Sequence, residues 1–130
     1  MPNTQEIQIN GVAAEGRSDF ANKVKFIVDT IGTSLAAFTV GTDPSTVGRW
    51  AAGKNRPNKL DTERRIENTY RVLRFLLDDG TKAPQRSCHE IRAWLMGVNA
   101  HLDDLSPAEA LLDGQYKDVM AAARAYSIGG

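Results

Sequence analysis

The chain has few of the residues on which metal sites, disulfides and membrane segments depend. It holds one cysteine, Cys88, and two histidines in 130 residues, so an internal disulfide framework is excluded and a zinc site would lack soft ligands. Its longest apolar stretches, at 34–40 and 72–77, are far shorter than the roughly 20 residues that a membrane span needs. No signal peptide opens the sequence. We therefore expect a cytoplasmic protein with no metal, no cofactor and no membrane association.

The sequence also has no excess charge of either sign, since 16 basic residues face 16 acidic ones. The distribution along the chain is nevertheless uneven. Residues 49–74 hold eight basic and three acidic side chains, whereas residues 103–124 hold five acidic and two basic ones. Because a local field attracts a polyanion more than the total charge does, the two regions indicate two kinds of partner. The alternative is a solvated helix with i,i+4 ion pairs, namely Asp61/Arg65 and Glu67/Arg71.

Signals for β-strands are almost absent, while helix start and stop signals alternate at short spacing. Two capping boxes, Ser87–Glu90 and Ser106–Glu109, mark helix starts, and glycines mark several helix ends. We therefore predict an all-α fold with about seven short helices. They are expected at 18–31, 34–41, 44–52, 61–77, 87–96, 106–112 and 115–126. The expected domains are a flexible leader over 1–17 with a short extended piece at 7–9, a helix-turn-helix domain over 18–79, and a C-terminal domain over 80–130 that opens with a hinge at 80–84.

Residues 34–52 carry the spacing of a helix-turn-helix. This unit needs a small residue in the first helix, a glycine at the turn and two buried residues on the second helix. The sequence supplies them as Ala37, Gly41, Val47 and Trp50. Gly41 can adopt the left-handed conformation of a tight turn without steric cost, and Asp43 can cap the second helix with Pro44 at its first position. An ordinary helical hairpin is the alternative, because Val47 and Trp50 would be core residues in either case.

The outward face of the second helix carries Ser45, Thr46 and Arg49. In a helix-turn-helix the start of this helix enters the major groove, so these three are the candidate base readers. The loop that follows is basic, and we expect Lys54 and Arg56 to lie against phosphates or bases. This stretch resembles the phage-repressor-like, or Xre-type, helix-turn-helix, which implies operator DNA as a partner. A homodimer is expected, because one short recognition helix covers only a few base pairs.

The last third of the chain is dense in apolar residues and has no plausible catalytic set. Cys88 with His89, and Asp103 with Asp104, are adjacent pairs that do not converge on one substrate, so we expect no enzyme activity. The apolar side chains either pack on the helix at 61–77 or partly face a partner. Composition alone leaves both possibilities open.

A family resemblance favours the partner. The last third is similar to the toxin-binding domain of the Xre/MbcA/ParS antitoxins, and the helix-turn-helix matches that family's usual partner domain, so that together they span most of residues 20–126. The residues that carry the C-terminal similarity are Trp94, Leu95, Gly97, Asn99, Leu102, Pro107, Leu111, Leu112, Gly114 and Val119. The sequence departs from the family's pattern at Asp103 and Asp104, which stand in place of the usual glycine, and in its short end over 127–130.

The resemblance implies an antitoxin of a type II toxin-antitoxin system, which binds a RES-domain, NAD-depleting toxin and regulates its own operon. The side chains then expected to contact the toxin are Trp94, Leu95, Leu111, Tyr116, Arg124 and Tyr126. The region of Arg124 and Tyr126 is expected over, or inside, the toxin's NAD-binding cleft. The expected assembly is a homodimer within a larger hetero-oligomer. The alternative is a plain helix-turn-helix transcriptional regulator whose C-terminal module only dimerises.

Overall fold

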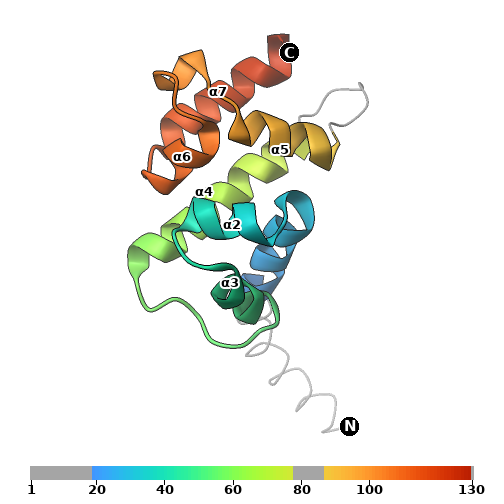
Figure 1. Ribbon diagram of the computed structural model, residues 1–130, viewed down its shortest axis with the longest axis vertical. Coiled ribbons are helices and arrows are strands. Elements are labelled where there is room, and N and C mark those ends of the chain that lie inside the picture. Colours follow the sequence, from blue (N-terminus) through green and yellow to red (C-terminus); the bar gives the residue numbers. More distant parts are fainter. Residues whose placement is uncertain (1–18, 78–86, 130) are drawn as a thin grey trace, which may run out of the picture.

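The computed structural model describes residues 19–77 and 87–129, and over these ranges its regular elements are all helices (Figure 1). The elements are a helix at 19–31, α2 (Thr33–Val40), α3 (Pro44–Ala51), α4 (Leu60–Leu77), α5 (Cys88–Met96), the 3-10 helix η1 (Ala100–Leu102), α6 (Pro107–Leu112) and α7 (Tyr116–Gly129). The predicted all-α fold is confirmed. The predicted leader over 1–17 and the predicted hinge over 80–84 lie outside the described residues.

Side-chain caps determine where three of these helices begin. The Asp43 side chain accepts a hydrogen bond from the Thr46 backbone N–H, with Pro44 at the first helical position. Ser87 and Ser106 both form complete capping boxes. Each cap satisfies backbone N–H groups that have no partner within the helix, so the predicted starts are confirmed.

Other boundaries differ from the prediction by short lengths. Helix α2 begins at Thr33 with Gly32 as its N-cap, which leaves Ser34 inside the helix instead of at its start. Helix α7 continues to Gly129, beyond the predicted end at 126. The 3-10 turn η1 was not predicted, because three residues are too few to show a hydrophobic period.

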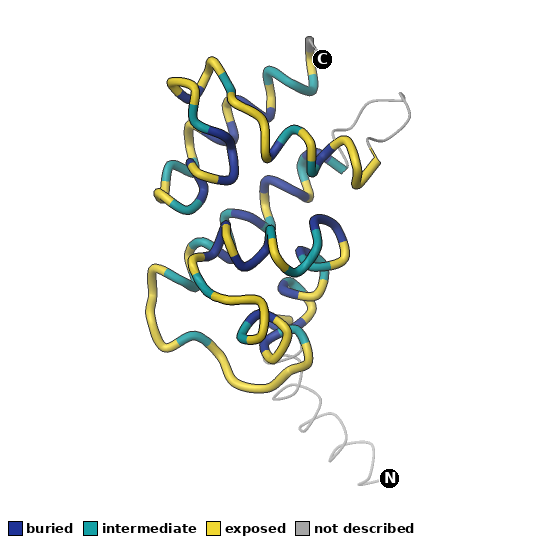
Figure 2. Tube along the Cα trace, viewed as in Figure 1, coloured by how far each residue is buried: buried dark blue, intermediate teal, exposed yellow. Residues whose placement is uncertain are grey.

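Helix α4 crosses the middle of the molecule and is shared by both halves of the chain (Figure 1). Its buried face includes Val72, Leu73 and Leu76, which are at most 1% exposed. Helix α2 packs on α3, α4 and α6, while α7 packs on α4 and α6. Buried residues from both sides of the predicted boundary at 79 and 80 therefore form one hydrophobic cluster, seen as the dark segments in the interior of Figure 2.

The turn between α2 and α3 lies directly against the end of α6. Gly41 has φ of 81°, and a Cβ added there would lie 3.2 Å from Leu112 Cδ1 and 3.3 Å from Arg65 Nη1. Arg65 Nε donates to the Leu112 carbonyl oxygen over 2.8 Å. This bond corrects the predicted Asp61/Arg65 pair, because the Arg65 guanidinium satisfies a carbonyl at the α6 C-terminus instead.

A second link joins the first helix to α4. Lys23 Nζ lies 2.8 Å from Glu67 Oε1, and Arg71 Nε donates to Glu67 Oε2 over 2.9 Å, which confirms the predicted Glu67/Arg71 pair. Partial burial of Glu67 opposes ionisation, yet the hydrogen bonds from Lys23 and Arg71 prevail and hold the pKa of Glu67 below its ordinary value. The hydrogen bond to Glu67 raises the pKa of Lys23.

We predict that Gly41→Ala destabilises the protein more than Gly53→Ala does. Both glycines are left-handed, with φ of 81° and 83°, but an added Cβ at Gly53 meets nothing within 4 Å. Gly53→Ala should therefore cost only the conformational strain, about 1 kcal/mol, and Gly41→Ala should cost about 1 kcal/mol more because Leu112 must move. Urea unfolding of both variants measures the difference, and equal costs would contradict the close contact.

The ion pair of Lys23 and Glu67 should make the free energy of unfolding depend on pH in the acidic range. A carboxylate whose pKa is lowered on folding stabilises the protein above its ordinary pKa, and that contribution disappears as the pH falls through the lowered value. Below about pH 4.3, the wild type should thus lose its stability advantage over Glu67→Gln. The advantage at neutral pH should not exceed about 1 kcal/mol, because the pair is partly solvated. Thermal unfolding of both proteins across this range checks the sign, and a constant difference would contradict it.

Candidate functional site

The first candidate surface is the outward face of α3. Val47 and Trp50 are 1% and 6% exposed, as predicted, and they hold α3 against the core. The turn before α3 is closed by backbone bonds from Gly41 and Thr42 to the Ala37 carbonyl, each 2.9 Å long. Packing on one side and the tight turn on the other leave the start of α3 facing solvent.

The predicted base readers Ser45, Thr46 and Arg49 lie on this exposed start. Ser45 and Arg49 are exposed and Thr46 is half-buried. Asp43 Oδ2 accepts from the Thr46 hydroxyl over 2.9 Å, and Arg49 Nη2 donates to the same hydroxyl over 3.1 Å. The backbone N–H of Thr46 and then its hydroxyl hold the pKa of Asp43 below its ordinary value. Thr46 and Arg49 are thus connected to the cap of the helix that carries them.

Most of the basic residues between 49 and 74 are committed to contacts within the chain. Arg65 bonds to Leu112, Arg71 bonds to Glu67 and lies beside the Tyr116 phenol, and the Arg74 guanidinium lies 5.4 Å from the centre of the Phe26 ring. Arg56 contacts Phe20 and Glu63. Within the described residues, the basic side chains of this stretch that have no ion pair, side-chain hydrogen bond or cation-π contact are Lys54, Lys59 and Arg64.

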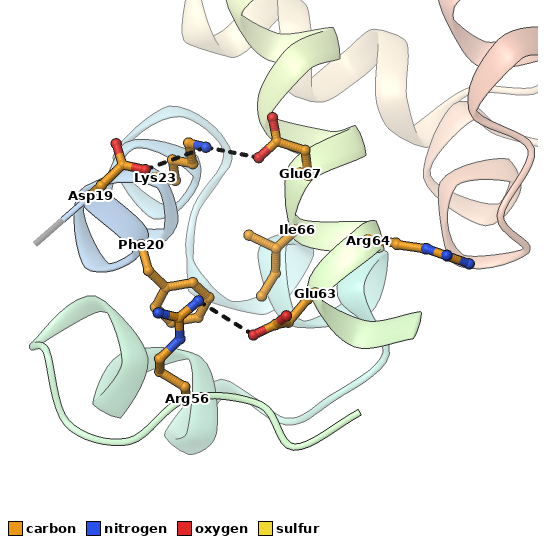
Figure 3. A pocket seen from close by; sticks show the side chains of 8 residues that line it. All are labelled: Asp19, Phe20, Lys23, Arg56, Glu63, Arg64, Ile66 and Glu67. Carbon is orange, nitrogen blue, oxygen red and sulfur yellow. Dashed lines mark hydrogen bonds and ion pairs between the residues drawn. The ribbon is translucent and has the colours of Figure 1, made fainter. Parts of the chain in front are cut away.

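The loop between α3 and α4 holds the two predicted contacts Lys54 and Arg56. Lys54 is exposed, and its backbone N–H donates to the Arg49 carbonyl over 2.8 Å, so the loop begins close to the end of α3. Arg56 is different, because its guanidinium lies over the Phe20 ring and its Nη2 reaches Glu63 Oε2 (Figure 3). Lys54 is therefore open to a phosphate, whereas Arg56 already has two partners.

The second candidate surface is a groove in the C-terminal half. Trp94 of α5 and Tyr126 of α7 stack there, with ring centres 5.5 Å apart and planes at 18°. The groove beside them has a volume of about 480 Å³. Its lining residues are Trp94, Val98, Asn99, Ala100, His101, Ala122, Ala125 and Tyr126. Val98 is 80% exposed, so a large aliphatic side chain stands in solvent at the edge of a half-buried aromatic pair.

The structure divides the six residues predicted to contact a toxin. Trp94 and Tyr126 line the groove, Tyr116 is half-buried near Arg71, and Arg124 is exposed on α7. Leu95 and Leu111 are fully buried in the core, which corrects the expectation that they contact a partner. Both short helices use one leucine to close the interior, and periodicity over so few residues does not tell which apolar side chain that is.

Three exposed apolar residues at or just beyond the ends of α5 and α7 were not predicted as site residues. They are Met96, Val98 and Ile128, with Met96 at the end of α5 and Ile128 in the last turn of α7. Their position in the sequence could have indicated Met96 and Val98. They flank Gly97, where α5 ends and the following side chains no longer pack against the core.

The sequence departure at Asp103 and Asp104 has a structural reason. Both residues have left-handed backbones, with φ of 54° and 65°, a conformation that glycine adopts most easily and that aspartate tolerates better than most residues. The Asn99 carbonyl accepts from the Asp104 N–H over 3.0 Å, and the Asn99 side chain accepts from the His101 N–H. The turn at one end of the groove is therefore closed by hydrogen bonds with aspartate at both left-handed positions.

The described residues offer neither a membrane helix nor a metal centre. Over 19–77 and 87–129, no helix is long and apolar enough to cross a membrane, and no group of three or more His, Cys, Asp or Glu side chains could hold a metal ion. The geometry defines a small helical protein with two solvent-facing surfaces, one on α3 and its following loop and one at the α5 and α7 groove.

Comparison with known proteins gives the family. No family model matches the chain. It is 30% identical over 90 residues, 69% of its own length and 74% of theirs, to the mycobacterial cidal antitoxin MbcA of Mycobacterium tuberculosis and of Mycobacterium bovis. Its fold matches a chain in the crystal structure of the M. tuberculosis MbcT-MbcA toxin-antitoxin complex, with a TM-score of 0.64, 25% identity, and coverage of 81% of this chain and 90% of that one. The chain belongs to the MbcA antitoxin family.

Proposed function

We propose that this protein is the antitoxin of a type II toxin-antitoxin system and that it neutralises its toxin by binding it at the Trp94–Tyr126 groove. The observation that carries the proposal is the combination of membership in an antitoxin family with a groove on the C-terminal half that is lined by the Trp94–Tyr126 stack and the exposed Val98. The resemblance seen in the sequence further suggests a RES-domain toxin that depletes NAD. NAD then belongs to the toxin, and the antitoxin itself needs no catalytic group.

The chemistry of the groove suits a protein partner. Tyrosine and tryptophan are enriched at interface hot spots, because each combines a large apolar area with a directional hydrogen-bonding group. The stack holds both rings in place before binding, so little conformational freedom is lost when a partner covers them. Val98, exposed beside the stack, gains from the same burial.

The end of α7 gives the proposal a route to inhibition. Tyr126 is fixed against Trp94, and the helix continues for three more residues to Gly129. Arg124 and Tyr126 therefore lie within the regular part of α7 and not in an irregular C-terminal tail. We propose that toxin binding places this end over the NAD-binding cleft, where Arg124 can pair with an acidic group of the toxin.

Val98→Lys should weaken toxin binding at least about tenfold, or ~1.4 kcal/mol, because it places a charge in the apolar contact. Leu60→Lys is the matched control, since Leu60 is also an exposed aliphatic residue, 61% exposed, but lies at the start of α4. Both variants should keep the wild-type melting temperature. Co-expression with the toxin, followed by growth, cellular NAD and pull-down, measures the effect. Full protection by Val98→Lys would exclude the groove as the binding site.

The same experiment separates this proposal from the alternative of a plain transcriptional regulator. A regulator whose C-terminal module only dimerises would not protect cells from a neighbouring toxin and would not co-purify with it. In that case Val98→Lys would instead change the oligomeric state, which analytical ultracentrifugation would detect.

We also propose that the antitoxin binds operator DNA as a dimer through the start of α3 and regulates its own operon. The support is the exposed start of α3 with Ser45, Thr46 and Arg49, followed by a loop with unpaired basic residues. Helix α3 has only eight residues, so two copies related by a two-fold axis would be needed for a palindromic site of useful length.

Arg49→Ala should weaken operator binding by about 1–3 kcal/mol and relax sequence preference, because a bidentate arginine contact discriminates a guanine edge. Lys54→Ala should weaken binding to every sequence and reduce the slope of log K against log salt by about 0.9. Fluorescence anisotropy over a salt series, on operator and scrambled duplexes, distinguishes the two. Unchanged operator affinity in Arg49→Ala would remove α3 as the reading helix.

A further inference from the structure

We propose that Arg56 is a positioning residue that holds the basic loop between α3 and α4 in place for DNA, and that it is not itself a phosphate contact. The inference rests on the proposed DNA binding, and it reverses the role that the sequence suggested for this arginine. Its basis is a clamp made by Arg56, Phe20 and Glu63.

Arg56 has two partners from two different helices. Its Cζ lies 4.6 Å from the centre of the Phe20 ring, on the helix at 19–31, and its Nη2 lies 3.4 Å from Glu63 Oε2, on α4 (Figure 3). A planar guanidinium suits this arrangement, because it can stack on an aromatic face while its edge donates to a carboxylate. The side chain thereby ties the loop to both neighbouring helices.

The clamp is also in contact with α3, the proposed reading helix, through Phe20. The Phe20 ring contacts Trp50 of α3 edge-on, with ring centres 6.3 Å apart, and Trp50 is buried. A side chain that packs on Phe20 therefore helps to position the loop relative to α3. The other partner of Arg56, Glu63, is in α4, so the contacts of the clamp extend to all three helices around the loop.

Backbone hydrogen bonds hold the two ends of this loop, from the Lys54 N–H to the Arg49 carbonyl and from the Glu63 N–H to the Lys59 carbonyl, and Arg56 lies between them. Between α3 and α4 it crosses two left-handed residues, Gly53 at φ 83° and Asn55 at φ 64°, and residues 54–57 have no regular secondary structure. Ordering a flexible segment costs conformational entropy at the moment of binding. If Arg56 holds the loop, the loop is already ordered in the free protein and little further entropy is lost on binding. Lys54 and Lys59, on either side of Arg56, are then presented in one arrangement.

The charges around Arg56 argue against a phosphate contact. Glu63 offsets the positive charge of Arg56, whereas Lys54 and Lys59 have no carboxylate partner among the described residues. A phosphate approaching Arg56 would also meet the Glu63 carboxylate, and like charges repel. The net attraction for DNA at the loop therefore resides in the two lysines.

The decisive test is the direction in which one substitution, Glu63→Gln, changes the affinity for operator DNA. Removing a carboxylate near DNA should by simple electrostatics leave binding unchanged or strengthen it. We expect Glu63→Gln instead to weaken operator binding about three- to tenfold, because it releases the loop. Asp61→Asn is the matched control: it removes the same charge from the first turn of α4, where Asp61 is exposed and has no side-chain partner among the described residues. It should leave binding unchanged or strengthen it.

Arg56→Lys provides the second arm. A phosphate contact tolerates lysine, since the charge is kept, whereas a clamp does not, since the stacking plane is lost. We expect Arg56→Lys to bind as weakly as Glu63→Gln, and the double variant to be no weaker than either single one, because both break one clamp. Wild-type affinity for Arg56→Lys together with unchanged or tighter binding by Glu63→Gln would overturn the proposal.

A measurement without DNA separates this inference from the proposed DNA binding. Trypsin can cleave after Lys54 and Lys59, and cleavage needs a mobile loop, so Glu63→Gln and Arg56→Lys should raise the cleavage rate at these bonds at least about threefold over wild type and Asp61→Asn. Unchanged rates in both variants would overturn the clamp. Raised rates in a protein that binds no operator duplex would retain the clamp and overturn the DNA-binding proposal alone.

Discussion

Helix α4 must pack against both halves of the chain at once, and the rest of the structure depends on this constraint. Helix α2 of the N-terminal half and helices α6 and α7 of the C-terminal half all pack on it, and α2 also packs directly on α6. Val72 and Leu73 are completely buried along it, so neither half could lose α4 and keep its core. The proposed DNA-reading face and the proposed toxin groove are therefore connected to one helix, α3 through α2 and the groove through α7, although they lie in different halves of the chain.

The same constraint explains what happens to the positive charge of residues 49–74. Two arginines of α4 make polar contacts toward the C-terminal half: Arg65 donates to a carbonyl of α6, and Arg71 bonds to Glu67 and lies beside Tyr116. Counting charges along the sequence therefore does not show which of these side chains are free to move onto a phosphate. Among the described residues, the basic side chains with neither a polar partner nor an aromatic contact are Lys54, Lys59 and Arg64, in the loop before α4 and in the early part of that helix.

Features that depend on neighbouring residues, such as helix starts, could be predicted from the sequence. Contacts between residues far apart in the chain could not. Caps at Asp43, Ser87 and Ser106 act within three residues, so the starts of three helices could be read directly. The partner of Arg65 could not, because Leu112 is 47 residues away. Leu95 was likewise assigned to a surface, since a short apolar helix does not reveal which of its faces meets the core. The proposed base readers and toxin contacts stay predictions, while the groove between α5 and α7 became visible only with the fold.

The two tryptophans show that the surroundings of a residue decide whether it serves the core or a binding surface. Trp50 and Trp94 each sit on a short helix, in the sequences Arg-Trp-Ala-Ala-Gly and Ala-Trp-Leu-Met-Gly. Trp50 is 6% exposed and meets Phe20 edge-on, as in a packed interior, whereas Trp94 lies flat on Tyr126 and keeps part of its surface beside an open groove. What differs is the chain after each glycine: the first continues into the basic loop, and the second into exposed Val98 and the turn that ends the groove. The ring that still has apolar surface to bury is Trp94, and burial of that surface is what a protein partner would supply.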